Sequence, residues 1–235
     1  MNQPQIYVPN LTPTNKIILI ICGVIFFLSS LFEISVGFSF MPYLAISWKG
    51  VSNGGIHQLI TFPFFDKSFF GILFNGLIVW FLGSELEVNW GRKLYIKFLL
   101  TCTLGASLFY IALGAIFANS IIASLPMMGL GAITFGMMGA YAIIYSDRYF
   151  TFMFLFPIKA RYFCLILAAI QIYTAIFSPY AKTAFGHLAG MGMGIAFLFG
   201  KSYFARRGAG AKNNSKSHLK LVKNQDDDKH PKYWQ

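Results

Sequence analysis

One histidine stands inside a long apolar segment of this sequence, and it is the residue best placed to do chemistry. His187 lies in the glycine-rich run Gly186–Gly194. An imidazole can take up and return a proton near neutral pH, which is what a general base does in catalysis. A polar ring among apolar side chains is costly without a partner, so we expect His187 to face protein. Its role is either that of a base or that of a buried, hydrogen-bonded structural side chain.

A second glycine-rich run, residues 128–141, is the natural packing partner of the histidine-bearing segment. In the interior of a soluble helix each glycine would cost about 1 kcal/mol relative to alanine. In a bilayer, glycines instead let two helix backbones approach closely. We therefore predict that the two runs pack against each other. The glycines of this second run are Gly129, Gly131, Gly136 and Gly139.

Three further polar side chains could take part in a site around the histidine. Asn75 lies in another apolar run, where it either hydrogen-bonds across helices or holds a water molecule. Thr134 lies three residues after Gly131, on roughly the same helix face, but a threonine in an apolar helix often bonds the carbonyl four residues earlier. Ser124 precedes the run in a loop and would need a different register. We expect neither hydroxyl to act as a nucleophile.

The cysteines indicate no metal site and no cofactor. They lie far apart in apolar runs and lack C-x-x-C spacing. We expect them to be small buried apolar side chains. They are Cys22, Cys102 and Cys164.

The composition predicts a multi-pass membrane protein. Apolar residues make up 56% of the chain, charged residues 11%, and the mean hydropathy is +0.59. A helix needs roughly 20 apolar residues to cross a hydrocarbon core about 30 Å thick. The net charge of +11 does not indicate nucleic acid, because nine of the nineteen Lys and Arg residues lie from Lys201 onward, beside the last apolar run. Such a juxtamembrane cluster favours anionic lipid of the bilayer.

The expected fold is an all-α bundle of six transmembrane helices. The spans are predicted at about residues 17–38, 69–82, 94–118, 128–145, 162–176 and 184–204. The segment 39–68 is too polar to span but rich in aromatic residues, so we expect a loop partly embedded in the membrane. The domains are then an N-terminal arm (1–15), a membrane domain (16–204) and a disordered basic tail (205–235).

The loop charges predict that both termini are cytoplasmic, since Lys and Arg collect on the cytoplasmic side of a membrane. In a bacterium this membrane would be the inner, or plasma, membrane. One side of the six-span path carries Lys16, Arg92, Lys93, Arg148, Lys159, Arg161 and the tail. The other side carries only Lys49, Lys67 and Lys182.

Four short patterns, in this order along the chain, resemble those of a known family. The patterns are Gly83-x3-Glu87-x3-Gly91, Gly129 with Phe135-Gly136, the segment Phe156-Pro-Ile-Lys-Ala160, and His187-x2-Gly190-x3-Gly194. On six spans of this orientation, the chain resembles the rhomboid intramembrane serine proteases from about Thr12 to Phe204. The second pattern matches both ends of the family motif G-x-S-G-A-x-F-G.

The resemblance implies a catalytic serine on the fourth helix, hydrogen-bonded to a histidine on the sixth. His187 occupies the position of that base, but Gly131 stands where the nucleophilic serine belongs and Ala132 where the next glycine belongs. Phe135 keeps an aromatic ring that could stack on His187. A hydroxyl nucleophile needs such a base to remove its proton, and a glycine has no group to activate.

The family also holds the oxyanion with a histidine four residues before an asparagine, a spacing that puts both on one helix face. Here Asn75 is retained, but Gly71 replaces that histidine. A further family histidine, in the turn before this span, falls on Asp66. We expect Glu87 to bind backbone amides in the loop after the first span.

These departures favour a proteolytically inactive rhomboid-like protein, a pseudoprotease that binds or guides transmembrane clients without cutting them. The alternative is an active serine-type intramembrane endopeptidase with an unrecognised nucleophile. A small membrane transporter is a second alternative, disfavoured because the spans hold very few charged residues.

Overall fold

The first membrane helix shows how the sequence sets its own boundaries. In the computed structural model, which describes residues 9–118, 125–147, 149–152, 156–178 and 181–212, helix α1 covers Pro13–Val36. Proline suits the first helical turn, where its missing N–H is not needed. Gly37, with a φ of 70°, ends the helix in the left-handed conformation that glycine adopts without strain.

The segment between the first two spans forms a folded loop of short helices. These are α2 (Met41–Leu44), α3 (Trp48–Ser52), α4 (Gln58–Thr61) and the 3₁₀ turn η1 (Phe62–Phe64). Gln58 is 2% exposed and donates from Nε2 to the carbonyl of Pro42 at 2.8 Å. Ile46 exchanges two backbone hydrogen bonds with Met127, at 2.9 and 2.8 Å. The loop is thus tied to the chain that leads into the fourth span.

The second span is longer than its apolar stretch predicts. Helix α5 (Phe69–Ile78) continues through a π-helical stretch, η2 (Val79–Gly83), into α6 (Ser84–Trp90). Ser68 caps its start by accepting from the backbone N–H of Gly71 at 3.1 Å. Gly91, with a φ of 78°, separates α6 from α7 (Arg92–Ile116).

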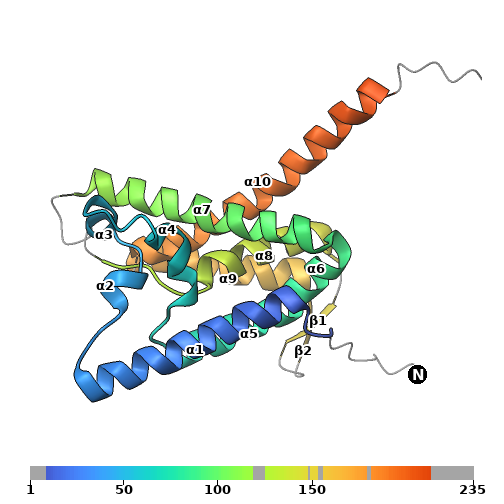
Figure 1. Cartoon of the computed structure of the whole chain (residues 1–235). Helices are drawn as coiled ribbons and strands as arrows, with labels where there is room; N and C mark the ends of the chain where they lie inside the picture. Colours follow the sequence, from blue (N-terminus) through green and yellow to red (C-terminus); the bar gives the residue numbers. More distant parts are fainter. Residues whose placement is uncertain (1–8, 119–124, 148, 153–155, 179–180, 213–235) are drawn as a thin grey trace, which may run out of the picture. The chain divides into compact units, whose positions relative to one another are not determined.

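Helix α8 (Gly131–Ile144) is the most deeply buried element of the fold. Every residue from 131 to 141 is buried. Figure 1 shows α8 between α7 and α9 (Ala160–Phe177), and it also contacts α5 and η2. With 14 residues it is shorter than the predicted span 128–145, because the chain enters it through the extended segment around Met127.

The chain before the fifth span forms a two-stranded hairpin, and its second strand begins the family-like segment Phe156–Ala160. Strands β1 (Tyr149–Phe152) and β2 (Phe156–Lys159) pair antiparallel, with Tyr149 opposite Lys159. Helix α10 (Ala181–Lys212) follows α9. The compact unit of the membrane helices ends at Phe199, and α10 continues past it. The predicted domain boundaries at 15/16 and 204/205 stay predictions.

The described helices confirm a multi-pass membrane protein. Five of them are long and apolar enough to cross a bilayer, and α8 is the shorter sixth. Large apolar side chains point outward from α1 and α9, as contact with lipid requires. The three cysteines are buried, as predicted. The five long helices are Pro13–Val36, Phe69–Trp90, Arg92–Ile116, Ala160–Phe177 and Ala181–Tyr203.

A buried polar cluster joins α1 to α6 and α7, and it corrects the expectation for Glu87. Its Oε1 accepts from the hydroxyl of Thr14 in the first turn of α1, not from backbone amides of the loop. Asn15 accepts from the hydroxyl of Tyr95 at 2.7 Å. Glu87 therefore anchors the start of the first helix. The sequence could not show this, because 73 residues separate the two partners.

Candidate functional site

The position of the absent serine and the histidine lie directly against each other. A Cβ atom built on Gly131 would collide with Nε2 of His187 and lie 2.7 Å from Cε1 and 2.8 Å from Cδ2. Real Cβ atoms do not come this close to other heavy atoms. The imidazole therefore occupies the space in which a side chain at position 131 would begin.

Glycines bring α8 and α10 into backbone contact, as the two glycine-rich runs predict. A Cβ on Gly190 would lie 3.0 Å from Cα of Ala132, and one on Gly194 would lie 2.5 Å from the carbonyl oxygen of Gly136. The obstacles are backbone atoms, which cannot move aside as a flexible side chain can. This close approach is what places the ring of His187 at the first turn of α8.

The imidazole is held by stacking and not by a hydrogen bond to a hydroxyl. Phe135 stacks on His187 with ring centroids 5.5 Å apart and planes 6° apart, as expected from the sequence. Nδ1 of His187 is buried without a hydrogen-bond partner among the described residues. An unpartnered buried nitrogen is costly, so this atom is suited to a water molecule or to a group of a bound molecule.

Thr134, the substitute nucleophile considered from the sequence, is committed elsewhere. Its hydroxyl lies 2.9 Å from Oδ1 of Asn75 and 3.0 Å from the carbonyl oxygen of Gly131. The backbone partner is three residues earlier, where four was expected. Thr134 thus ties α8 to α5 through Asn75, one of the two outcomes open for that asparagine. Ser124 lies outside the described residues.

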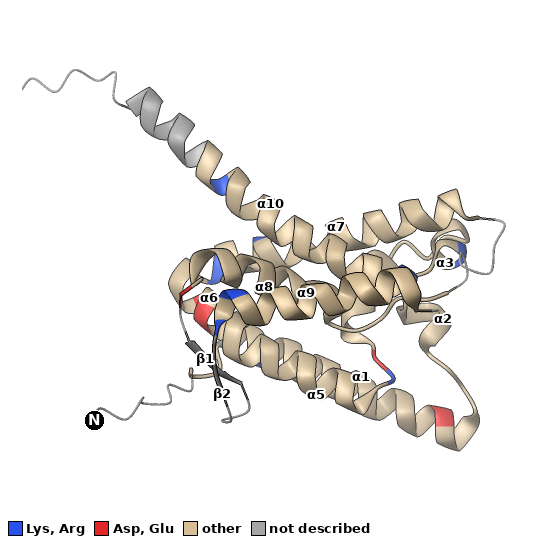
Figure 2. Cartoon of the chain, turned by 180° about the vertical axis from the view of Figure 1, so that it is seen from behind, with Lys and Arg blue, Asp and Glu red and all other residues tan. Residues whose placement is uncertain are grey.

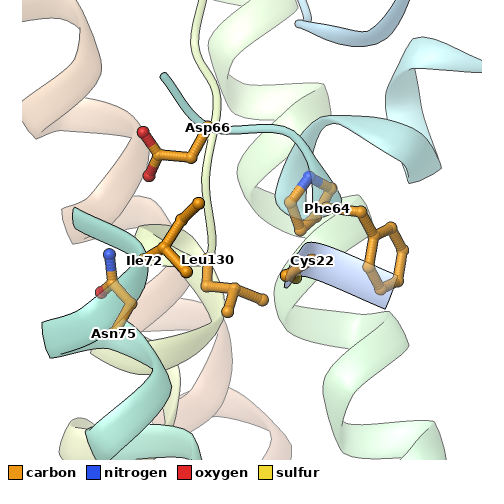
Figure 3. A pocket seen from close by; sticks show the side chains of 7 residues that line it. Cys22, Phe64, Asp66, Ile72, Asn75 and Leu130 are labelled. Atoms are coloured by element: carbon orange, nitrogen blue, oxygen red, sulfur yellow. The ribbon is translucent and has the colours of Figure 1, made fainter. Parts of the chain in front are cut away.

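A narrow crevice lies beside Asn75, too tight to admit a water molecule. Figure 3 shows Asp66 and Asn75 on one side of it, and Phe64 and Cys22 on the other. Asp66 belongs to the loop before α5. The crevice is lined by Cys22, Pro63, Phe64, Asp66, Ile72, Asn75 and Leu130.

The carboxylate of Asp66 fills the space next to two glycines, Gly71 and Gly129, which are 58 positions apart in the sequence. Its Oδ1 accepts from the backbone N–H of Ser68 at 2.9 Å. A Cβ on Gly71 would lie 2.9 Å from Oδ2, and a Cβ on Gly129 would lie 2.5 Å from it. Partial burial raises the pKa of Asp66, and the backbone N–H groups of Ser68 and Lys67 oppose this only in part.

The fold brings the positions compared with the family site into pairwise contacts, but with changed chemistry. Gly131 and His187 meet, Asn75 reaches α8 through Thr134, and Gly71 borders the carboxylate of Asp66. Such a group of residues holds a base and a hydrogen-bonding amide. Within the described ranges it holds no hydroxyl bonded to the base, and no group of three metal-ligating side chains.

Two features of the site could not be found from the sequence. The contact of Asp66 with Gly129 spans 63 positions and depends on how the loop folds back. Lys182, expected in a loop, lies in the first turn of α10 and is 5% exposed, with its ammonium 4.2 Å from the centre of the Tyr110 ring. Tyr110 stands in α7, 72 positions before Lys182, so no local pattern indicates this cation–π contact.

A comparison with protein families matches residues 53–204 to the Rhomboid domain. The matched range contains Asp66, Gly71, Asn75, Gly131 and His187. A comparison with curated proteins found no match.

Proposed function

The chain belongs to the rhomboid family of multi-pass membrane proteins, and from this premise we propose that it is a proteolytically inactive member that binds or guides transmembrane clients. Membership in a family predicts the fold of a protein but not the reaction that it catalyses. The proposal therefore depends on the site.

The single observation that carries it is the contact between Gly131 and His187. Peptide cleavage of the serine type needs an oxygen that attacks the carbonyl carbon while a base takes its proton. Position 131 has no side chain, and the imidazole itself fills the adjacent space. A base without a nucleophile cannot form an acyl-enzyme, and removing one member of such a unit costs about as much as removing all of it.

Binding of a client helix is supported by the apolar surface next to the site. On α5, Phe70 is 66% and Phe74 43% exposed, and their rings stack with centroids 6.4 Å apart. These rings stand on the helix that carries Gly71 and Asn75. A transmembrane segment lying along this face would come within reach of the crevice at Asp66.

The charge pattern supports an orientation with both termini in the cytoplasm. Figure 2 shows Lys and Arg of the compact unit mostly at the end of the bundle near α6 and α8. By the rule that basic residues stay on the cytoplasmic side, this end faces the cytoplasm and the loop helices α2, α3 and α4 face outward.

A labelling assay tests the proposal. Purified full-length protein is incubated with a fluorophosphonate probe and with a model transmembrane substrate. We expect neither labelling nor cleavage. The outcome that would contradict us is labelling of any residue that disappears in His187→Ala, because it would reveal a nucleophile served by that base and make the chain a serine-type endopeptidase.

The binding half of the proposal needs its own measurement. The protein is reconstituted in lipid nanodiscs with transmembrane peptides that carry a photoreactive group. We expect crosslinks to α5, and we expect Phe70→Ala with Phe74→Ala to reduce them. Leu108→Ala, which removes a 61% exposed side chain of α7, is the matched control.

A further inference from the structure

We propose that an exposed face at the start of α7 is a binding site for one anionic phospholipid. Three basic side chains hold the phosphate of its headgroup, and a stripe of apolar side chains beneath them carries an acyl chain. The inference goes beyond the proposed client binding and does not depend on it. The residues of this face, called the α7 lipid face below, are Arg92, Lys93, Ile96, Lys97, Leu100 and Leu104.

The six residues lie on one side of the helix. Four of them recur at every fourth position, and the two lysines each follow one of these four directly. All six are exposed, whereas Tyr95, Phe98 and Cys102 on the other side of α7 are buried in the core. From Ile96 to Leu104 the helix rises about 12 Å, most of the roughly 15 Å of hydrocarbon in one leaflet. The stripe is therefore long enough to accompany an acyl chain.

The three basic side chains of the α7 lipid face have no carboxylate partner among the described residues. The acidic side chains closest to them in the sequence stand on α6 and are engaged elsewhere. Glu87 accepts from the hydroxyl of Thr14, and Oε2 of Glu85 accepts from the hydroxyl of Tyr141 at 2.7 Å. The face therefore presents three positive charges that these carboxylates do not neutralise.

The position of these charges on the helix also calls for an anion. The N-terminal end of a helix carries a partial positive charge, so basic residues are unfavourable there and a negative group is favourable. The first turn of α7 contains no acidic residue, and Gly91 before it supplies no side-chain cap. A phosphate group would accept from the basic side chains and balance the positive end of the helix.

Lys97 indicates that the anion comes from the bilayer. Ionisable residues within transmembrane helices usually face the interior of the bundle, because a charge in hydrocarbon is costly. Lys97 belongs to the apolar helix Arg92–Ile116, yet it is exposed on the outer side. Its flexible stem lets the ammonium reach the headgroup level. Anionic lipids are enriched in the cytoplasmic leaflet, which this end of α7 meets in the proposed orientation.

Photoactivatable lipids test this inference. Full-length protein is reconstituted in phosphatidylcholine nanodiscs that contain a trace of one probe lipid. The probe carries a diazirine in its acyl chain and has either a phosphatidylglycerol or a phosphatidylcholine headgroup, and crosslinked positions are mapped by mass spectrometry. We expect the phosphatidylglycerol probe to label residues 92–104 at least about fivefold more than the phosphatidylcholine probe.

Helix α9 is a reference within the same molecule. Its outer side is also apolar, but the basic residues at its start have a carboxylate partner. Lys159 and Arg161 share Oδ1 of Asp147, at 3.6 and 3.9 Å. We therefore expect a clearly smaller preference for the phosphatidylglycerol probe on α9 than on α7.

Arg92→Gln with Lys93→Gln and Lys97→Gln should bring the labelling ratio on α7 close to one. Glutamine is a good helix former, so α7 is kept. The matched control makes the same change in net charge in the C-terminal tail and should keep the ratio. It replaces three lysines by glutamine: Lys220, Lys223 and Lys229. Thermal unfolding in detergent checks that both variants are folded.

The unaltered protein is decisive even if a variant fails to fold. Equal labelling of α7 by the two probes would overturn the lipid site, and so would an equally large preference on α9, because the attraction would then belong to the membrane surface in general. A preference that survives in the folded α7 variant, or that disappears in the tail variant, would overturn the assignment to the α7 lipid face.

Discussion

At the scale of single residues, the space beside each of two glycines in the site is filled by the side chain of a neighbouring residue. The imidazole of His187 occupies the space that a side chain at Gly131 would need, and the carboxylate of Asp66 occupies the space that a side chain at Gly71 would need. Each glycine is therefore coupled to one neighbouring side chain, 56 positions away for Gly131 and 5 positions away for Gly71. A side chain at position 131 would require the His187 ring to shift, and one at position 71 would require the Asp66 carboxylate to turn away.

The first prediction follows from this coupling. Gly131→Ser with Gly71→His should remain unlabelled by a fluorophosphonate, because the new histidine meets Oδ2 of Asp66. Adding Asp66→Gly removes that obstacle and the negative charge at the oxyanion position. We expect labelling to rise by about a hundredfold over the double variant, the usual worth of an oxyanion donor. Equal labelling of the two variants would show that Asp66 does not block the site.

The second prediction concerns the pH dependence of stability. Burial raises the folded-state pKa of Asp66 above its ordinary value of 3.8. The folded state therefore binds this proton more tightly than the unfolded state, so the contribution to stability is full below 3.8 and is lost as the pH rises through the folded pKa. Asp66→Asn should raise the unfolding temperature at pH 7 but leave it unchanged near pH 3.5. Thermal unfolding in detergent at both pH values checks the sign.

At the scale of elements, the distance between α8 and α10 decides the geometry of the site. The contacts are between backbones, with Gly194 against the carbonyl of Gly136 and Gly190 against Ala132. A helix pair packed on larger residues would hold His187 farther from the first turn of α8. The glycines thus allow the two helices to pack closely, and this close packing places His187 against Gly131.

A comparison of two alanine substitutions in α10 tests this packing. Gly194→Ala places a methyl group against a backbone oxygen and should lower the free energy of unfolding by about 1–3 kcal/mol, the usual cost of overpacking. Gly192→Ala is the control on the same helix, because nothing lies within 4 Å of its added Cβ. Equal unfolding temperatures for the two variants would contradict close packing at Gly194.

The anchor between α1 and α6 gives a further prediction at this scale. Thr14→Val removes the hydroxyl that donates to Glu87, whose Oε2 is already without a partner among the described residues. We expect a loss of about 1–3 kcal/mol, the penalty of leaving a buried acceptor unsatisfied. Thr101→Val serves as the control, because that exposed hydroxyl bonds only within its own helix.

At the scale of the whole molecule, Lys and Arg of the compact unit gather mostly at the end near α6 and α8, away from the loop helices α2 and α3. We expect an externally added, membrane-impermeant maleimide to label Lys49→Cys in intact cells and to leave Arg92→Cys unlabelled. The native cysteines are buried and should give little background. Labelling of Arg92→Cys from outside would reverse the proposed orientation and place the Asp66 crevice on the cytoplasmic side.

The sequence by itself determined the membrane class, the approximate spans and the pairing of the two glycine-rich runs. Runs of apolar residues and glycine spacing are local properties, and in a bilayer they leave few arrangements that satisfy the backbone. The sequence also showed that position 131 has no hydroxyl, because residue 131 is a glycine. The residue types likewise indicated the stacking of Phe135 on His187.

Only the tertiary structure decided what surrounds the histidine and the glycines. Asp66 reaches Gly129, Thr134 reaches Asn75 and Glu87 reaches Thr14 across 59 to 73 residues of chain. No local pattern encodes such contacts, since they depend on how the loop and the short helix α8 settle among longer helices. The residue types thus showed that the serine hydroxyl is missing at position 131. Only the packing showed that the carboxylate of Asp66 lies beside Gly71 and Gly129.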